Sequence, residues 1–325
     1  MALVSFIVPC FNYARYLGEC LDSILQQEGG WDIEVLAIDD ASTDDTQAVL
    51  ARCRDPRLRV ITHAANQGHI GTVTEGLLSV QGSFVSRIDP DDRLRRDYLN
   101  CTIPVLQAQP EIALVYGDVA QIDKHGRITQ ERSDAQHGGC DYQGNEFIAL
   151  LAHNFICAPS VIARREAWLE ALPVPEGLAF NDWHFTTMIA RRHQFCYLDR
   201  VLADYRVHGA NLHSRIGRNK SEEASVLRVL DRYYAETEES PTLEAAKRAA
   251  RSAIYATRCI EFADKYFGAG MAGDARRCYV QAIRHRPAAL FAHGVFRRLL
   301  GTVIGLRIYD SIKRMLRAGT HPGKP

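Results

Sequence analysis

Short apolar runs alternate with amphipathic stretches along the first 125 residues. The runs are rich in β-branched and aromatic residues, a pattern that predicts buried strands, and they lie at 4–8, 33–38, 58–61 and 84–88. The stretches between them place apolar residues three and four positions apart, which predicts helices at 16–27, 45–53 and 70–80. Strands that alternate with helices predict an α/β fold with a mainly parallel sheet, whose ligands bind at the carboxyl ends of the strands.

The remainder of the chain divides into a less regular middle and a helical end. Apolar patterning predicts further strands and helices at 113–122, 161–172, 183–191 and 194–198. From residue 221 onward the pattern is almost wholly helical, with a break at 268–273 inside a segment, 245–287, that resembles one tetratricopeptide-like hairpin. We therefore place a first domain at 1–217 and a helical extension at 218–325.

Two acidic clusters follow predicted strands. Asp39 and Asp40 end the second strand, and three carboxylates, Asp89, Asp91 and Asp92, follow the fourth. Aspartates at such places also serve as turn formers and helix caps. Their mutual repulsion favours a different interpretation, in which a cation neutralises them. Oxygen ligands suit Mg²⁺ or Mn²⁺, which complete their shells with phosphate oxygens, so the cluster suggests a metal-bound diphosphate.

Several protein classes are excluded by what the sequence lacks. The first predicted strand is not followed by G-x-G-x-x-G, and the chain contains no G-x-x-x-x-G-K-[ST], which argues against a dinucleotide dehydrogenase and a P-loop enzyme. Nine cysteines without a Cys-x-x-Cys pair or zinc-ligand spacing predict reduced thiols in a reducing compartment. The chain begins without a basic signal-peptide region and has no run of 18 apolar residues, so we expect neither a signal peptide nor a membrane span.

Six motifs in order resemble those of family 2 glycosyltransferases, which have the A-type glycosyltransferase fold. They lie at 4–12, 39–46, 66–68, 87–92, 181–185 and 205–211. The resemblance implies that Pro9 and Phe11 flank a nucleotide base and that Asp39 accepts a hydrogen bond from a uracil or thymine N–H. The other donor-binding residues that it implies come from the same motifs and are Asn12, Asp40, Asn66, Gly68 and Asp89.

The resemblance also implies the chemistry. Asp89 and Asp91 would form the D-x-D element that contacts the ribose and the metal, and His208 would be a further metal ligand. Asp182 would be the general base, although Asn181 stands where the family usually has Glu. Without that resemblance, Asp182 reads as a helix cap and His208 as a surface or hydrogen-bonded residue.

A few other side chains keep two interpretations. Arg206 could pair with the diphosphate or with a carboxylate of the protein. Trp183 and Phe180 could belong to the core or form an acceptor-sugar platform. His63 and His69 flank the third motif without an assigned role.

The implied activity is metal-assisted, inverting transfer of a sugar from a nucleotide-sugar donor, UDP- or dTDP-linked, to a hydroxyl of a glycan or lipid-linked acceptor. The resemblance suggests a role in polysaccharide biosynthesis for the cell envelope. Two alternatives stay open: a sugar-1-phosphate nucleotidyltransferase, which would need a glycine-rich basic loop that 9–13 does not supply, and a catalytically degenerate binding or scaffold protein.

The C-terminal end is strongly basic. Lys and Arg equal Asp and Glu over the whole chain, at 39 each, but residues 276–325 hold eleven basic residues and one acidic residue. The apolar and basic residues of 288–317 predict either a peripheral contact with an anionic membrane or an ordinary packed helix pair. Nucleic acid is a poor fit because apolar residues are too numerous. We expect a cytoplasmic protein, peripheral at the inner face of the membrane if the first interpretation holds.

Overall fold

A computed structural model describes residues 3–133, 136–175, 178, 181–208, 220–292 and 294–305. It divides into two compact units. The first comprises residues 1–150 and 154–218, and the second comprises 151–153 and 219–325. The expected boundary at 217/218 falls one residue from the observed division, among residues outside those described.

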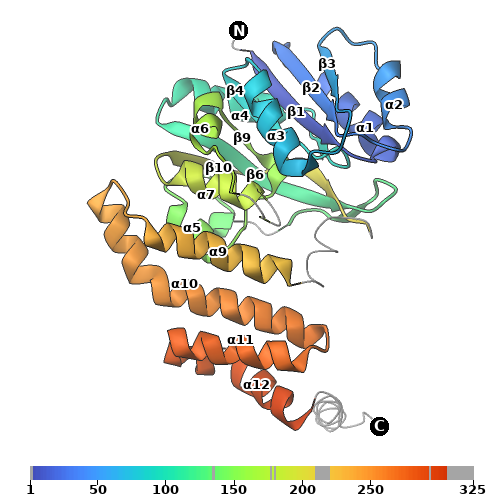
Figure 1. The fold of residues 1–325 in the computed structure, drawn as a ribbon. Helices are drawn as coiled ribbons and strands as arrows, with labels where there is room; N and C mark the ends of the chain where they lie inside the picture. The colour runs from blue at the N-terminus through green and yellow to red at the C-terminus, as the bar shows by residue number, and fades with distance from the viewer. Residues whose placement is uncertain are drawn as a thin grey trace, which may run out of the picture. The chain divides into compact units, whose positions relative to one another are not determined.

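The first unit contains a sheet with helices on both faces (Figure 1). Its strands are β1 (Val4–Cys10), β2 (Ile33–Asp39), β3 (Leu58–Thr62), β4 (Phe84–Arg87), β5 (Arg93–Leu94), β6 (Ile112–Ile122), β7 (Ile128–Gln130), β8 (Tyr142–Gly144), β9 (Ile162–Arg164) and β10 (Gln194–Arg206). Its helices are α1 (Ala14–Leu25), α2 (Thr46–Arg52), α3 (Gly68–Ser79), α4 (Tyr98–Ala108), α5 (Phe147–Ala152), α6 (Arg165–Glu170) and α7 (Asp182–Ala190), with 3₁₀ turns at Gln136–Gly138 and Ala158–Ser160.

The strand order is β3-β2-β1-β4-β9-β6-β10-β5, with β7 beside β6 and β8 beside β10. The pairs β3–β2, β2–β1, β1–β4 and β6–β10 are parallel. Strand β9 runs antiparallel between β4 and β6, so those two strands point the same way. The α/β fold with a mainly parallel central sheet is confirmed, and it places the carboxyl ends of β1, β2, β4 and β10 at one edge.

Strand β1 lies inside the sheet, between β2 and β4, and every one of its residues is buried. Alternate residues along a strand point to opposite faces. Val4, Phe6 and Val8 join the core that α1 and α4 complete on one face. On the other face α3 approaches so closely that a Cβ on Gly76 would lie 2.5 Å from Ile7 Cγ2. Such burial on both faces explains the nearly continuous apolar run of this strand.

The second unit is helical (Figure 1). Its elements are α9 (Ser221–Ala235), α10 (Pro241–Gly268), α11 (Ala272–His285), a 3₁₀ turn (Pro287–Phe291) and α12 (Val295–Ile304). The helix pair α10–α11 confirms the expected hairpin, and Gly270, at φ 78°, lies at the break. The nine cysteines are free thiols, as expected. Among the described residues, no helix combines the length and apolarity that crossing a membrane requires.

Candidate active site

Asp39 carries a buried carboxylate oxygen to which no group in the described part of the chain donates. The residue ends β2 and is 0% exposed; its Oδ1 accepts a hydrogen bond from the Ser42 backbone N–H at 3.1 Å. Its Oδ2 is also buried and accepts no hydrogen bond from the described residues. An unsatisfied buried acceptor costs about 1–3 kcal/mol, so this oxygen is suited to receive an N–H from a ligand.

Pro9 and Phe11, on either side of the last residue of β1, lie near this edge in different settings. Pro9 is buried inside the strand, beside Ile38 of β2. Phe11 follows the strand and is 44% exposed, one of the few large apolar side chains in the unit that face water. An exposed aromatic ring at a strand end is available to pack against a planar ligand.

Asn12 joins the turns that follow β1 and β2. Its backbone is left-handed, at φ 62°, a conformation that asparagine tolerates. Its Oδ1 accepts hydrogen bonds from Thr43 N at 2.8 Å and Asp44 N at 3.3 Å, while its own N–H donates to Ser42 Oγ at 2.9 Å. Asn12 therefore shapes the site by holding two loops together.

Asp40 holds the third motif in place. Its Oδ1 accepts from Gln67 N at 2.7 Å and lies 2.7 Å from His63 Nδ1, and its Oδ2 accepts from Gly68 N at 2.9 Å. Asn66 Nδ2 donates to the Asp40 backbone oxygen at 3.1 Å. Both carboxylate oxygens thus face protein groups, and the direct part of Asp40 in donor binding stays a prediction.

His63 completes that arrangement, although the sequence suggested no role for it. Its Nε2 lies 2.7 Å from Glu75 Oε2 of α3. The bond with Asp40 raises the pKa of His63 against the opposing effect of burial, and the Glu75 bond adds to the rise. Burial alone would raise the pKa of Asp40, but the hydrogen bonds from Gln67, His63 and Gly68 outweigh it and hold that pKa below its usual value. The sequence did carry one signal for this role, because His63 lies between the acidic motif at 39–46 and the motif at 66–68.

Three carboxylates crowd the segment after β4. Asp89 Oδ1 is held by Arg87 Nη1 at 2.6 Å, and Asp91 Oδ2 lies 2.9 Å from His208 Nε2. Asp92 Oδ1 accepts from the Arg206 backbone N–H at 2.8 Å, and its Oδ2 is buried without a partner among the described residues. Burial and the charge of Asp89 raise the pKa of Asp91, with the His208 bond acting the other way. Burial and the neighbouring Asp91 raise the pKa of Asp92 well above its usual range.

This donor set fits a divalent cation, although the protein groups alone do not form a closed metal site. Within the described residues there is no group of three or more His, Cys, Asp or Glu side chains arranged to hold a metal. Asp91 and His208 form a pair, and Asp89 is engaged by Arg87. Oxygen-rich Mg²⁺ and Mn²⁺ sites commonly need only one or two protein ligands because phosphate oxygens and water supply the rest.

Asp182 begins α7 with an unsatisfied oxygen. Its Oδ2 accepts from Asn154 Nδ2 at 3.5 Å, while Oδ1 is buried with no partner among the described residues. The N-cap position of α7 is held by Asn181, and Asp182 is the first residue inside the helix, so Asp182 is not its cap. Trp183 is buried and donates to the Leu150 carbonyl at 2.7 Å, so it belongs to the core; Phe180 lies outside the described residues.

Arg206 pairs with the protein. The guanidinium of this buried residue contacts Glu19 of α1 and the Asp91 carbonyl, so the interpretation as a structural ion pair is confirmed for this structure. His69, the other histidine beside the third motif, lies 2.9 Å from Arg87 through its Nε2.

The family model for "Glycosyl transferase family 2" matches residues 5–171, about half of the chain. The chain therefore belongs to glycosyltransferase family 2, and it is a glycosyltransferase. An uncharacterized glycosyltransferase of Nostoc sp. is 27% identical over 68% of this chain and 69% of its own length. The succinoglycan biosynthesis protein ExoO of Rhizobium meliloti is 34% identical, but the match covers 41% of this chain and only 38% of that protein.

Solved structures support the A-type fold. S. aureus TarS in complex with UDP-GlcNAc superposes with a TM-score of 0.64 at 17% identity, over 99% of this chain and 93% of that one. The mannosyltransferase PcManGT of Pyrobaculum calidifontis, in complex with GDP-Man and Mn²⁺, gives 0.61 at 17% identity, over 96% and 86%. At such identities the likeness concerns the fold.

Proposed function

We propose that this chain transfers a sugar, with inversion, from a UDP- or dTDP-linked donor to a hydroxyl of a glycan or lipid-linked acceptor. The single observation that carries the proposal is the contact of Asp91 with His208 at the edge of the sheet where β4 and β10 end, the same edge at which Asp39 ends β2. Nucleotide-sugar complexes of TarS and PcManGT, which share the fold, support a donor of this class.

The donor would bind at the turns after β1 and β2. A uracil or thymine N–H would donate to the unpartnered Oδ2 of Asp39, while Phe11 would cover the face of the base. The turns that Asn12 joins, and the backbone at Asn66 and Gly68 that Asp40 orients, would shape the walls. A buried acceptor without a protein donor discriminates strongly because a ligand without the matching N–H leaves it unpaired.

Asp91 and His208 would hold Mg²⁺ or Mn²⁺, and the diphosphate of the donor would complete the shell of that cation. A bound cation would supply Lewis-acid stabilisation of the departing diphosphate. The crowding of Asp89, Asp91 and Asp92 supports this assignment because like charges in a buried place are stable mainly beside a cation. Asp89 would contact the ribose in an orientation that Arg87 fixes.

Asp182 would act as the general base. Its Oδ1, which has no partner among the described residues, would take the proton of the acceptor hydroxyl while the oxygen of that hydroxyl forms a bond to the anomeric carbon. The bond from that carbon to the diphosphate breaks with its electron pair leaving on the diphosphate, so the configuration inverts and no covalent enzyme intermediate is formed. Asn154 would orient the carboxylate through its contact with Oδ2.

We also propose peripheral binding to the inner face of a membrane through the basic segment 288–317, of which 293 and 306–317 lie outside the described residues. Helix α12 exposes Phe296, Leu300 and Val303 in one stripe at a spacing of four and three, and Phe291 just before it is 86% exposed. Apolar side chains facing water within a strongly basic segment suit an anionic lipid surface. This location would accord with envelope polysaccharide synthesis on lipid-linked acceptors.

Vesicle binding tests the membrane proposal. The full chain should bind vesicles that contain phosphatidylglycerol more tightly than neutral phosphatidylcholine vesicles, because each basic residue near an anionic surface contributes about 1 kcal/mol. Added salt should weaken this binding, because salt screens the attraction between the charges. Phe296→Asp with Val303→Asp should reduce binding, whereas Leu78→Asp, at an equally exposed position of α3, should not. Absence of binding by the full chain would leave the stripe as an ordinary surface.

Release of nucleoside diphosphate tests the main proposal. A panel of UDP-, dTDP- and GDP-linked sugars is incubated with Mn²⁺ and glycan or lipid-linked acceptors, and UDP or dTDP release is expected. Asp182→Asn serves as the control for protein-catalysed transfer. Pyrophosphate release from a nucleoside triphosphate and a sugar 1-phosphate would instead indicate a nucleotidyltransferase. Donor binding without any turnover would indicate a scaffold.

A further inference from the structure

The buried side chain of Arg206 supports the segment that carries Asp91. Arg206, the last residue of β10, is 1% exposed and bonds to that segment twice: its backbone N–H donates to Asp92 Oδ1, and its Nε donates to the Asp91 carbonyl at 2.7 Å. Its Nη1 donates to the Asp123 carbonyl at 3.1 Å. One arginine thus ties the end of β10 to the turn after β4.

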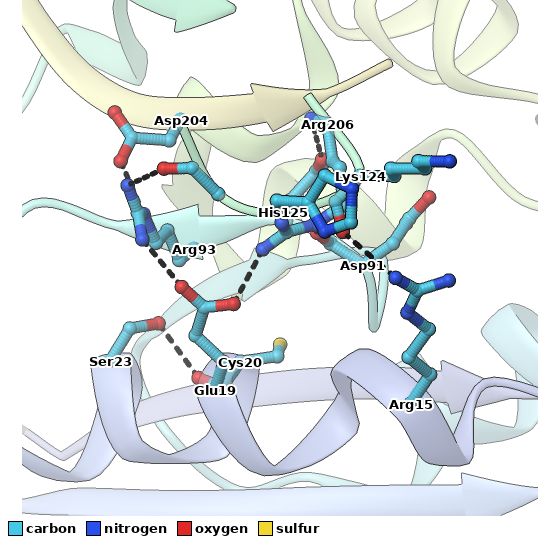
Figure 2. Close-up of polar contacts among 12 residues, drawn as sticks. Arg15, Glu19, Cys20, Ser23, Asp91, Arg93, Lys124, His125, Asp204 and Arg206 are labelled. Carbon is cyan, nitrogen blue, oxygen red and sulfur yellow. Dashed lines mark hydrogen bonds and ion pairs between the residues drawn. The ribbon is translucent and has the colours of Figure 1, made fainter. Parts of the chain in front are cut away.

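Glu19 of α1 neutralises this arginine. Its Oε2 accepts from Arg206 Nη2 at 2.6 Å, and its Oε1 accepts from Arg93 Nη1. Arg93 in turn pairs with Asp204, two residues before Arg206 on the same strand. Figure 2 shows Glu19 rising from its helix between the two arginines, with Asp91 beside Arg206.

The same arginine also reaches the setting of His208. Its guanidinium lies over the Tyr16 ring, 4.6 Å from the ring centroid, and the centroids of the Tyr16 and His208 rings are 5.3 Å apart. His208 follows Arg206 by two residues, so the position of one restricts the other. Arg206 is therefore in contact with the backbone of Asp91 and, through Tyr16, with the surroundings of its histidine partner.

We propose that Glu19 and Arg206 are positioning residues that set the affinity for the divalent cation by fixing the geometry of the Asp91–His208 pair. The inference rests on the proposed role of that pair in metal binding. Both residues act behind the site, because the contacts of the Arg206 side chain that are described above go to the Asp91 and Asp123 carbonyls, Glu19 and Tyr16. Loss of a partner that orients a metal ligand typically weakens metal binding by about 10- to 100-fold.

Two variants test the inference in the full chain. Glu19→Gln keeps the shape of the partly exposed side chain and removes its charge. Arg206→Lys keeps the charge but loses the guanidinium, whose several N–H groups reach Glu19 and the two carbonyls together. The matched control is Arg164→Lys on β9, another arginine that donates to the carbonyls of 106, 109 and 112, away from the carboxylates. Free Mn²⁺ is measured by electron paramagnetic resonance, with and without UDP, and thermal unfolding is followed in parallel.

We expect about 10- to 100-fold weaker Mn²⁺ binding for Arg206→Lys, a smaller loss for Glu19→Gln, and wild-type affinity for Arg164→Lys even where its unfolding temperature falls. During turnover the apparent KM for Mn²⁺ should rise more than kcat falls, a split that a general loss of stability does not produce. If Arg206→Lys does not fold, Glu19→Gln decides.

Two results overturn the inference and are distinguishable. If the wild type binds Mn²⁺ and both variants bind it with an affinity within twofold of the wild-type value, the positioning role alone is refuted. Absence of Mn²⁺ binding by the wild type, with and without UDP, would refute the metal assignment of Asp91 and His208 and the inference with it.

Discussion

Asp39→Asn separates ligand recognition from folding. The substitution keeps Oδ1 as the acceptor for Ser42 N and replaces the unpartnered Oδ2 by an amide, which donates. In the wild type the N–H of the base would donate to Oδ2; in the variant it would face the amide N–H of Asn, which is also a donor, and no hydrogen bond could form. A hydrogen bond to a charged group contributes about 1.5–3 kcal/mol, which corresponds to a loss of about 10- to 150-fold in affinity.

Calorimetric titration with UDP and Mn²⁺ measures that loss, and inorganic pyrophosphate with Mn²⁺ serves as a ligand without a base. We expect weaker UDP binding, unchanged pyrophosphate binding and an unfolding temperature no lower than that of the wild type, because no described protein group donates to Oδ2. UDP affinity within twofold of the wild type would refute the assignment of Asp39 to the base.

Asp118→Asn on β6 is the matched control because it removes a buried carboxylate whose Oδ2 does have protein donors, Arg132 and Tyr197. Breaking these contacts leaves buried polar groups unpaired, so we expect this variant to lose about 1–3 kcal/mol of stability and to bind UDP normally. The two variants should therefore show opposite behaviour in the two measurements.

The other predictions concern the base, the metal and the third motif. Asp182→Asn should lose at least about 100-fold in kcat while UDP affinity, measured calorimetrically, stays unchanged; near-normal turnover would move the base elsewhere. Asp91→Ala should fold, by circular dichroism, yet lose transfer, and wild-type activity in excess EDTA would contradict the metal role. His63→Ala should destabilise the protein by about 1–3 kcal/mol because it leaves Asp40 and Glu75 without their partner. The pKa of His63 is raised in the folded state, so the stability that His63 contributes should be full below about pH 6.5, its ordinary pKa, and should be lost as pH rises through the folded pKa. Urea unfolding of the wild type and the variant at several pH values measures this difference. A pH-independent difference would contradict this.

The alternating pattern of the first half was sufficient to predict the α/β fold, because buried parallel strands are apolar along their whole length. Helix α4 was not predicted: Tyr98, Leu99 and Ile103 have helical spacing, but Pro104 interrupts the pattern. Strand β10 extends to Arg206, beyond the expected end at 198, because its later residues pair with β6 although charged residues interrupt their apolar pattern.

The acidic clusters and the ordered motifs indicated a candidate site, which stays a prediction, while the partners of each side chain could not be predicted. Sequence order does not show that Asp40 faces His63 and the backbone at Gln67, nor that Arg206 turns toward Glu19. Such contacts join segments that are tens to hundreds of residues apart, and spacing along the chain carries no information about them.

The junction at Asn12 has a thermodynamic consequence. Because its side chain and backbone already fasten the turns after β1 and β2, the walls of the proposed nucleotide site would be ordered before a donor arrives. Little conformational entropy is then lost in these loops on binding, and little reshaping is available to admit another base. Selection among nucleotides would therefore depend on how well each base fits a preorganised site that does not change shape. Its calorimetric signature should be a binding entropy that hardly varies between donors, with their differences in affinity expressed in enthalpy.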